Sequence, residues 1–197
     1  MKFFVRLILT LLVISLVGGA TAQTTTSARV KRSEEILKKI RETELLNQIL
    51  PVLMTKEQIR KIIPEIEKAR EVVRQTEAAE LEVLKKLEPE VDAVLKDGYG
   101  KSKVPTREFF DQYDKEFKKM RVVRTQIILI NSGKVMAVAK EVLNKGQLEA
   151  ARKALSPTIF EADKDPKTLT DDEKLLMWVR VVLLDPQSYD ILIKLSK

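Results

Sequence analysis

The feature that most constrains the fold is a long series of apolar residues spaced three and four positions apart. The series consists of Ile59, Ile62, Ile66, Ala69, Val73, Leu84, Leu87, Val91 and Val94. Side chains at these spacings lie on one stripe of an α-helix rather than on one face of a strand. The stripe is narrow, as in a helix that packs along a single neighbour. Thr55 and Gln58 form a capping box, which predicts that this helix begins directly after Thr55.

Helices are also expected on both sides of the long one. Ser33 is the expected N-cap of a first helix that ends at Pro51. Pro105 and Thr106 open a helix with an apolar face made of Phe110, Tyr113, Phe117, Met120, Ile127 and Ile128. A helix of this kind, following the long one after a short loop, predicts a long antiparallel helical hairpin.

Shorter helices are expected in the last third of the chain. One covers residues 147–155, and one follows the capping box of Thr170 and Glu173. A last one starts at Asp185 and Pro186, with Asp as cap and Pro at the first position. No segment bounded by turn signals alternates with the period of a strand. The sequence therefore predicts an all-α fold, a long antiparallel hairpin with additional shorter helices packed on it.

Four places inside these patterns predict an interruption or an end. Pro64 should bend the long helix or split off its first turn, because proline lacks an amide and crowds the preceding turn, and Pro89 poses the same problem later. The Gly-containing stretch 97–100 is expected to close the same helix, with Gly at its C-terminal cap. Residues 131–133, Asn-Ser-Gly, are expected to kink or break the following helix.

Two charged residues interrupt the apolar faces of the long helices. Glu80 occupies a position of the first stripe, and Arg124 lies between Phe117 and Ile128 on the second. If residues 98–105 form the hairpin loop, facing positions have numbers that sum to about 203, which places Glu80 beside Arg124. We expect the two to pair, because an unpaired buried charge costs several kcal/mol. The alternative is that both side chains reach solvent at a kink.

Composition excludes several classes of chemistry. The chain has no His and no Cys, so it lacks Cys/His zinc sites, cysteine nucleophiles, Ser-His-Asp relays and disulfides. Aromatic residues make up 5% of the chain, which weighs against a stacking platform for single-stranded nucleic acid. Phosphate-binding and hydrolase motifs are also missing. We expect a protein that is not an enzyme, with no catalytic, metal or cofactor-binding residue and no nucleic-acid partner.

Residues 1–22 have the pattern of an export signal. Lys2 and Arg6 form a short positive segment before an apolar run, and Ala20-Thr21-Ala22 supplies the small-residue cleavage pattern. The run is shorter than the roughly 20 residues of a membrane-spanning helix, although an uncleaved anchor remains the alternative. We expect cleavage after Ala22, no transmembrane segment afterwards, and a periplasmic or secreted protein. The rest would be a disordered linker, 23–32, and a single all-helical domain, 33–197.

Positive charge is concentrated in one part of the chain. The whole sequence has a formal charge of +7, and residues 101–155 carry 13 basic against 6 acidic residues. Lys115, Lys118, Lys119, Arg121 and Arg124 crowd one stretch, but at the angular spacing of a helix they spread around it. Such a segment is either a solvated helix surface or a site for acidic or unfolded partners.

Two five-residue stretches resemble a known motif. Residues 54–58, Met-Thr-Lys-Glu-Gln, resemble the LTxxQ motif of the Spy/CpxP family of bacterial periplasmic proteins, and residues 169–173, Leu-Thr-Asp-Asp-Glu, resemble a second copy. Met54 replaces the Leu of the motif and Glu173 replaces the Gln. The resemblance implies a small, exported, all-helical protein with a basic surface. It also implies a cradle-like dimer that shields partly unfolded envelope proteins without ATP.

The helical pattern and the resemblance together give a set of expected site residues. The expected partner-binding residues are Lys115, Lys118, Lys119 and Arg121, with Arg60, Arg70 and Arg74 as weaker candidates, and the expected structural residues are Glu80, Arg124, Thr55, Gln58, Thr170 and Glu173. Two functions remain open. The first is a periplasmic holdase or stress adaptor that binds unfolded proteins. The second is a structural or interaction protein of the cell envelope that dimerises or docks through its long hairpin.

Overall fold

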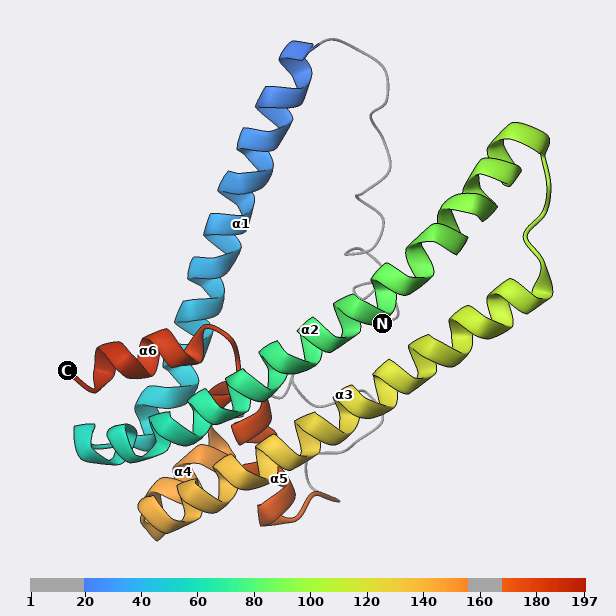
Figure 1. Cartoon of the computed structure of the whole chain (residues 1–197). Helices are drawn as coiled ribbons and strands as arrows, with labels where there is room; N and C mark the ends of the chain where they lie inside the picture. The colour runs from blue at the N-terminus through green and yellow to red at the C-terminus, as the bar shows by residue number, and fades with distance from the viewer. Residues whose placement is uncertain (1–19, 156–167) are drawn as a thin grey trace. The chain divides into compact units, whose positions relative to one another are not determined.

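The computed structural model describes the backbone of residues 20–155 and 168–197, and side chains from residue 28 onward within these ranges. This part of the chain is all-α and contains no strand. The elements are α1 (Ala20–Ile49), the 3-10 turn η1 (Leu50–Val52), α2 (Lys56–Lys101), α3 (Arg107–Val142), α4 (Lys145–Lys153), α5 (Asp171–Trp178), the π-helical turn η4 (Val179–Leu183) and α6 (Ser188–Leu195) (Figure 1).

Contacts divide the chain into two units, residues 1–41 and 42–197. The first unit differs from the expected linker, 23–32, and from the expected helix start at Ser33. Helix α1 begins at Ala20, and Ser33 lies in its interior. Residues 28–35 include Ala, Arg, Lys and Glu and contain neither Gly nor Pro, so their propensity favours a helix. Arg32 and Glu35 add an ion pair one turn apart, with Nη1 2.9 Å from Oε2. The predicted signal peptide lies almost entirely outside the described residues.

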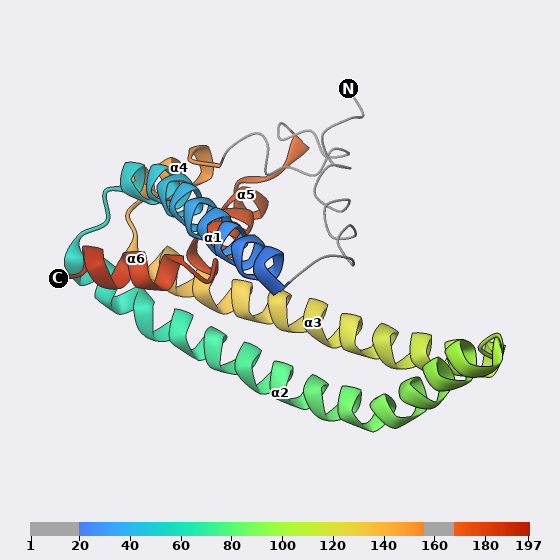
Figure 2. The ribbon, with the colours of Figure 1, turned by 90° about the horizontal axis from the view of Figure 1, so that it is seen from above.

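In the second unit, α2 and α3 lie side by side in both views (Figures 1 and 2). Side chains of one helix bond to groups of the other at several points along the pair, among them Asn131 to the carbonyl of Ala69, Arg124 to Glu80, and Gln112 to Glu90. Residue numbers rise along α2 as they fall along α3, and each pair sums close to the expected 203. The predicted pairing of Glu80 with Arg124 is confirmed.

The two long helices are not broken at the predicted interruptions. Pro64 and Pro89 both lie inside α2, which continues through them, although α2 changes direction in its part nearest residue 100 (Figure 2). A proline removes one hydrogen bond, and the many other bonds of a 46-residue helix hold the element together. Residues 131–133 likewise lie within α3. Both polar side chains there find carbonyl partners, so the helix has no need to open.

The C-terminal end of α2 also differs from the prediction. The helix passes through Gly98 and Gly100 and ends at Lys101. Ser102 takes the left-handed conformation, with φ of 52°, in place of the expected glycine. The main-chain amide of Lys103 and the side chains of Lys101 and Lys103 all donate to Asp97. These contacts satisfy the end of the helix without a glycine cap.

Two predicted capping boxes are present, at Thr55 with Gln58 and at Thr170 with Glu173. The sequence reading missed a third, in which Asn144 and Gln147 start α4 at Lys145, two residues before the expected start. At the other end, α6 begins at Ser188 rather than at Pro186. The carboxylate of Asp185 accepts from the amide of Gln187 at 2.9 Å, so it stabilises the preceding turn instead of capping a helix.

The apolar core occupies one end of the pair of long helices. It contains Leu45, Ile49, Val52, Ile59, Ile62, Ile66, Ala69, Val135, Ala139, Leu143, Ala151, Leu155, Leu175, Trp178, Val179, Val182, Leu183, Ile191 and Leu192. Only the first third of α2 and the last third of α3 contribute to it. Trp178 is fully buried at the centre, and its indole N–H donates to the carbonyl of Gln48 at 3.2 Å.

Beyond this core, α2 and α3 leave much of the predicted stripe open to solvent. Val73 and Leu84 are each 41% exposed, although both belong to the apolar series that identified the helix. Two helices alone cover each other along one line and leave both sides of that line uncovered. We call residues 70–101 of α2 together with residues 107–130 of α3 the arm.

Candidate functional site

A group of apolar and charged side chains surrounds one hollow where the arm meets the core. The hollow has a volume of about 450 Å³, and we call it the arginine groove. Helix α2 contributes Ala69, Arg70, Val73, Arg74 and Glu77. Helix α3 contributes Ile127, Ile128 and Asn131, and the last part of the chain contributes Arg180, Leu184 and Pro186.

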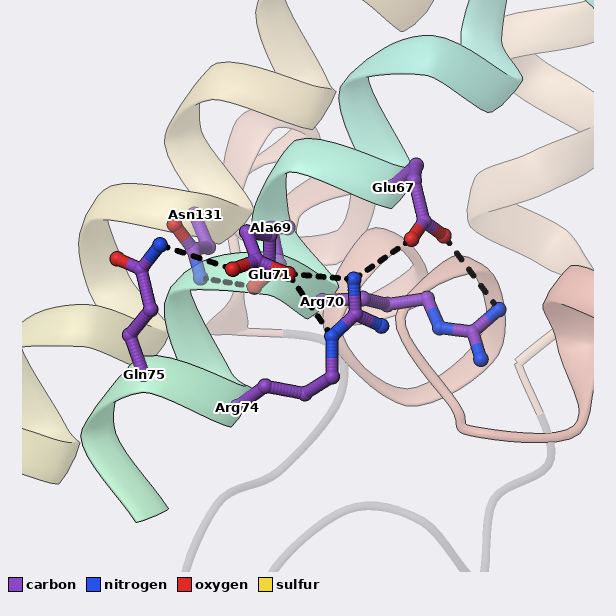
Figure 3. A network of polar contacts seen from close by, with 7 residues as sticks. All are labelled: Glu67, Ala69, Arg70, Glu71, Arg74, Gln75 and Asn131. Carbon is purple, nitrogen blue, oxygen red and sulfur yellow. Dashed lines mark hydrogen bonds and ion pairs between the residues drawn. The ribbon is translucent and has the colours of Figure 1, made fainter. Parts of the chain in front are cut away.

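Helical spacing brings the α2 side chains of the groove together. Val73, Arg74 and Glu77 lie three, four and seven positions after Arg70, which places the four on one face. The register against α3 is held by Asn131, whose side-chain amide donates to the carbonyl of Ala69 at 3.2 Å (Figure 3). Asn131 is buried, so this hydrogen bond also satisfies a polar group that water does not reach.

Arg74 is held in place by two carboxylates of its own helix. Its Nη2 lies 2.8 Å from Oε1 of Glu67 and 2.7 Å from Oε2 of Glu71, and its Nε lies 2.9 Å from the latter (Figure 3). Hydrogen bonds from Arg74 and Gln75 hold the pKa of Glu71 below its ordinary value. The bonds to Glu67 and Glu71 in turn raise the pKa of Arg74. These contacts leave Arg74 little capacity to bind another anion.

Arg70 is positioned differently from Arg74. Its guanidinium carbon lies 4.0 Å from the centre of the Tyr189 ring, within the range of a cation–π contact. Its Nη1 is buried and has no hydrogen-bond partner, since the nearest carboxylate oxygen, Oε2 of Glu67, is 3.7 Å away. The charge of Nη1 is therefore balanced by Glu67 at ion-pair distance, although the two atoms are too far apart for a hydrogen bond.

The structure separates the predicted partner-binding residues into three groups. Lys115, Lys118 and Arg121 are exposed on α3, outside the arginine groove. Lys119 belongs to this first group on α3 but pairs with Glu116, with Nζ 2.6 Å from Oε1. The second group is Arg60 alone, which donates through Nε and Nη2 to the carbonyl of Ser196 and ties the start of α2 to the end of α6.

The third group consists of Arg70 and Arg74, which line the groove and come closest to a formed site. None of the basic residues of the segment 115–121 lines the groove. Their spacing spreads them around α3.

Among the predicted structural residues, Glu80 and Arg124 make a two-pronged contact. Arg124 Nε lies 2.6 Å from Glu80 Oε1, and Nη2 contacts the other carboxylate oxygen. The hydrogen bonds from Arg124 lower the pKa of Glu80, and the same contact raises the pKa of Arg124. The side chain of Glu80 is 9% exposed and that of Arg124 is 61% exposed. Arg124 therefore covers the carboxylate while its own far side stays in water.

Gln58, the last residue of the first LTxxQ-like stretch, has a role beyond capping its own helix. Its side-chain nitrogen donates to the carbonyl of Val142 and to Oε1 of Gln147, both at 2.9 Å. Gln147 returns a hydrogen bond to Oε1 of Gln58 at 2.8 Å and donates to the carbonyl of Leu53. The capping boxes of α2 and α4 thus bond to each other. In this chain the motif residues are part of the packing of the core end.

Arg180 is the groove residue that the sequence reading missed. It is exposed, and no hydrogen bond or ion pair holds it within the described part of the chain. The signal that could have found it is the segment 175–184, Leu-Leu-Met-Trp-Val-Arg-Val-Val-Leu-Leu, in which Arg180 is the single charge. A lone arginine in an apolar run must reach solvent or a partner at the edge of the core.

Residues 20–155 and 168–197 contain no group of three or more acidic, His or Cys residues that could hold a metal ion. One helix of these ranges, α3, is long and apolar enough to cross a membrane by length and composition alone. Such a helix is weak evidence for a membrane span. The same helix carries Arg124 and Asn131, and both make hydrogen bonds to α2.

No family model, curated protein or solved structure matches the chain. The resemblance to the Spy/CpxP family therefore rests on the two short motif stretches.

Proposed function

We propose that this protein is an exported, periplasmic, all-helical binding protein that holds partly unfolded envelope proteins without ATP. In this proposal α2 and α3 form an antiparallel hairpin whose arm presents the binding surface. The observation that carries the proposal is the combination, on the arm, of half-exposed apolar side chains with unpaired cations. Binding rather than catalysis also suits a chain without His and Cys.

The apolar part of this surface comes from both long helices. Leu81, Leu84 and Leu95 of α2 are 41–50% exposed, and Phe110, Val122 and Val123 of α3 are 44–49% exposed. Exposed apolar side chains in such numbers on neighbouring elements are typical of a surface that contacts another chain. Each contact is weak by itself, so a partner held in this way is able to leave again.

The charged part of this surface consists of Lys115, Lys118 and Arg121, which are exposed on α3. Cations of this kind attract acidic chains over distance and accelerate their association more than they strengthen the final complex. We therefore expect fast, salt-sensitive capture of aggregating proteins that carry a net negative charge.

An aggregation-suppression assay tests the proposal. Residues 23–197 are mixed with α-lactalbumin that is reduced by dithiothreitol. Dithiothreitol has no disulfide to reduce in the present protein, because its chain has no cysteine. We expect light scattering to fall at stoichiometric amounts in low salt and to fall less in 0.3 M salt, about twice the physiological ionic strength. No protection at several-fold excess would rule out the holding function.

A matched pair of variants locates the activity. Leu81→Ser with Leu84→Ser removes apolar surface from the arm, whereas Leu37→Ser with Leu53→Ser makes the same change at exposed positions elsewhere. We expect protection to be lost in the first variant and kept in the second. Circular dichroism confirms that both remain helical.

A second function, a structural or interaction protein of the envelope, is favoured by a different observation. Gly133 lies in the middle of α3, and a Cβ added to it would meet no atom within 4 Å. Leu129 and Ile130, one turn before it, are 54% and 55% exposed. A glycine beside exposed apolar residues allows another helix to approach closely. Sedimentation of wild type and Gly133→Leu tests this: a self-associating species that disappears in the variant supports the second function.

A further inference from the structure

The arginine groove supports an inference that goes beyond the proposed function and does not depend on it. We propose that the groove is a binding site for a small amphipathic anion, an aliphatic chain that ends in a carboxylate. The site is separate from the arm surfaces of Lys115, Lys118 and Arg121, and it uses residues to which the holding function gives no role.

The apolar wall of the groove matches an aliphatic chain. Val73 and Ile128 are 41% and 44% exposed and face the same hollow as Ile127, Leu184 and Pro186. Its volume of about 450 Å³ lies within the usual range for small-molecule sites, roughly 300–1,000 Å³. A chain lying in it would remove apolar surface of both partners from water.

The polar part of the groove matches a single anionic head group. Its lining contains Arg70, Arg74 and Arg180 against one carboxylate, that of Glu77. Arg74 is bonded to Glu67 and Glu71. Of the three guanidinium groups, that of Arg180 keeps free capacity, because it is exposed and has no hydrogen-bond or ion-pair partner within the described ranges, whereas Nη1 of Arg70 is buried and faces Oε2 of Glu67 at 3.7 Å. A carboxylate accepts hydrogen bonds from guanidinium groups with good geometry, often two at a time.

The groove suits an aliphatic chain better than an extended peptide. Its walls are helices, whose main-chain groups bond within their own helix. The amide of Asn131 already donates to Ala69. A peptide lying here would find few partners for its own amide and carbonyl groups, and each unpaired group would weaken binding. An aliphatic chain has no such groups and places its single polar end at the arginines.

Isothermal titration calorimetry tests the proposal on residues 23–197, with sodium dodecanoate kept below its micelle concentration at pH 8. We expect saturable binding of one dodecanoate per chain. Acetate, which has no chain, should not bind, and dodecyltrimethylammonium, which has the same chain and the opposite charge, should bind at least tenfold more weakly. Equal affinity for the anionic and cationic amphiphiles would overturn the proposal, because it would show apolar adsorption only.

Two variants test the arginine contact. Arg180→Gln removes a cation that has no partner among residues 20–155 and 168–197, so the fold should be unaffected and dodecanoate should bind about 10- to 100-fold more weakly, as for the loss of a charge-assisted hydrogen bond. Lys118→Gln makes the same change of charge on α3 outside the groove and should leave the affinity unchanged. Equal affinities of Arg180→Gln and wild type would overturn the proposal.

A vesicle experiment separates a free carboxylate from a membrane surface as the source of the anion. Flotation with vesicles of phosphatidylglycerol measures binding to an anionic bilayer. Capture by these vesicles without binding of monomeric dodecanoate would overturn the groove site, because surface attraction needs only exposed cations. Dodecanoate binding in a protein that fails to suppress aggregation would support this site and remove the holding function, so the two proposals fail separately.

Discussion

At the scale of single residues, the most informative side chain is Glu80. It is 7% exposed although it lies beyond the apolar core, on a part of α2 where neighbouring leucines are half open. Arg124 accounts for this burial, because its guanidinium lies across the carboxylate and donates to both oxygens. The pair therefore holds α2 and α3 in register at a point where few apolar side chains are buried. This role belongs to folding rather than to catalysis.

The first prediction concerns the pH dependence of this pair. The hydrogen bonds from Arg124 lower the pKa of Glu80 in the folded state. A carboxylate with a lowered folded pKa stabilises the fold at pH above its unfolded value, about 4.3, and that stabilisation is lost as pH falls through the folded value. We expect Glu80→Gln to lower the thermal midpoint at pH 7 and to approach wild type as pH falls toward 3.

The matched control is Glu82→Gln, which removes the partner of Lys85 in an exposed pair 2.8 Å apart. Exposed pairs of this kind contribute little to stability. A thermal midpoint at pH 7 that shifts equally in the two variants would contradict the special role of Glu80.

The second prediction concerns the bond between the two capping boxes. Gln58→Ala leaves the carbonyl of Val142 and part of the Gln147 amide without partners. Unpaired groups of this kind cost about 1–3 kcal/mol each, so urea unfolding should show a loss of at least about 1 kcal/mol. Gln75→Ala removes a glutamine whose one bond, to Glu71, lies on an exposed helix surface. The two variants should differ clearly, and equal losses would show that Gln58 only caps its own helix.

At the scale of elements, the helices were predictable and their ends and interruptions were less so. Thr55, Thr106 and Thr170 are N-caps as expected, because the cap needs only residues adjacent in sequence. Pro64 and the 131–133 stretch did not break their helices. Whether a proline or an Asn-Ser-Gly sequence ends a helix depends on what packs around it, and local sequence carries no information on that.

The third prediction concerns Gly133 in the middle of α3. Glycine in a helix interior costs roughly 0.5–1 kcal/mol relative to alanine, and an added Cβ at this position meets no neighbour within 4 Å. Gly133→Ala should therefore raise the free energy of unfolding by about that amount in urea titrations. Gly146→Ala is the comparison, because its Cβ would come 3.4 Å from the capping oxygen of Asn144. A smaller gain is expected there, and a loss at Gly133 would indicate a close contact with another chain.

At the scale of the whole molecule, the compact unit begins at Glu42 and not at Ser33. The last two turns of α1 belong to the core: Leu45 is fully buried, Ile49 is 2% exposed, and the carbonyl of Gln48 accepts from the indole of Trp178. Residues 20–41 are helical as well, but their described apolar side chains, such as Leu37 at 63%, are exposed.

The fourth prediction follows from this division. A fragment of residues 42–197 should unfold cooperatively with the same emission maximum as residues 23–197, because Trp178, the single tryptophan, keeps its surroundings. A fragment of residues 54–197 lacks Leu45, Ile49 and Val52, and its tryptophan emission should shift to longer wavelength. Fluorescence and thermal melts of both fragments check this. A red-shifted spectrum in the longer fragment would show that residues before Glu42 are part of the core.

The sequence by itself determined the helical class, the N-caps of the long helices and the pairing of Glu80 with Arg124. These depend on periodicity, on neighbours within one turn, and on the constraint that facing positions in a hairpin have a constant sum. The tertiary structure alone decided where the core ends and which arginines converge on one hollow. Arg70 and Arg180 are far apart in the chain, and they line one hollow because η4 packs against α3 while α6 packs against α2. The apolar stripe of α2 continues in sequence beyond the gap between Val73 and Leu84, but burial needs a third element, and within the described residues such an element packs on the stripe only at the core end.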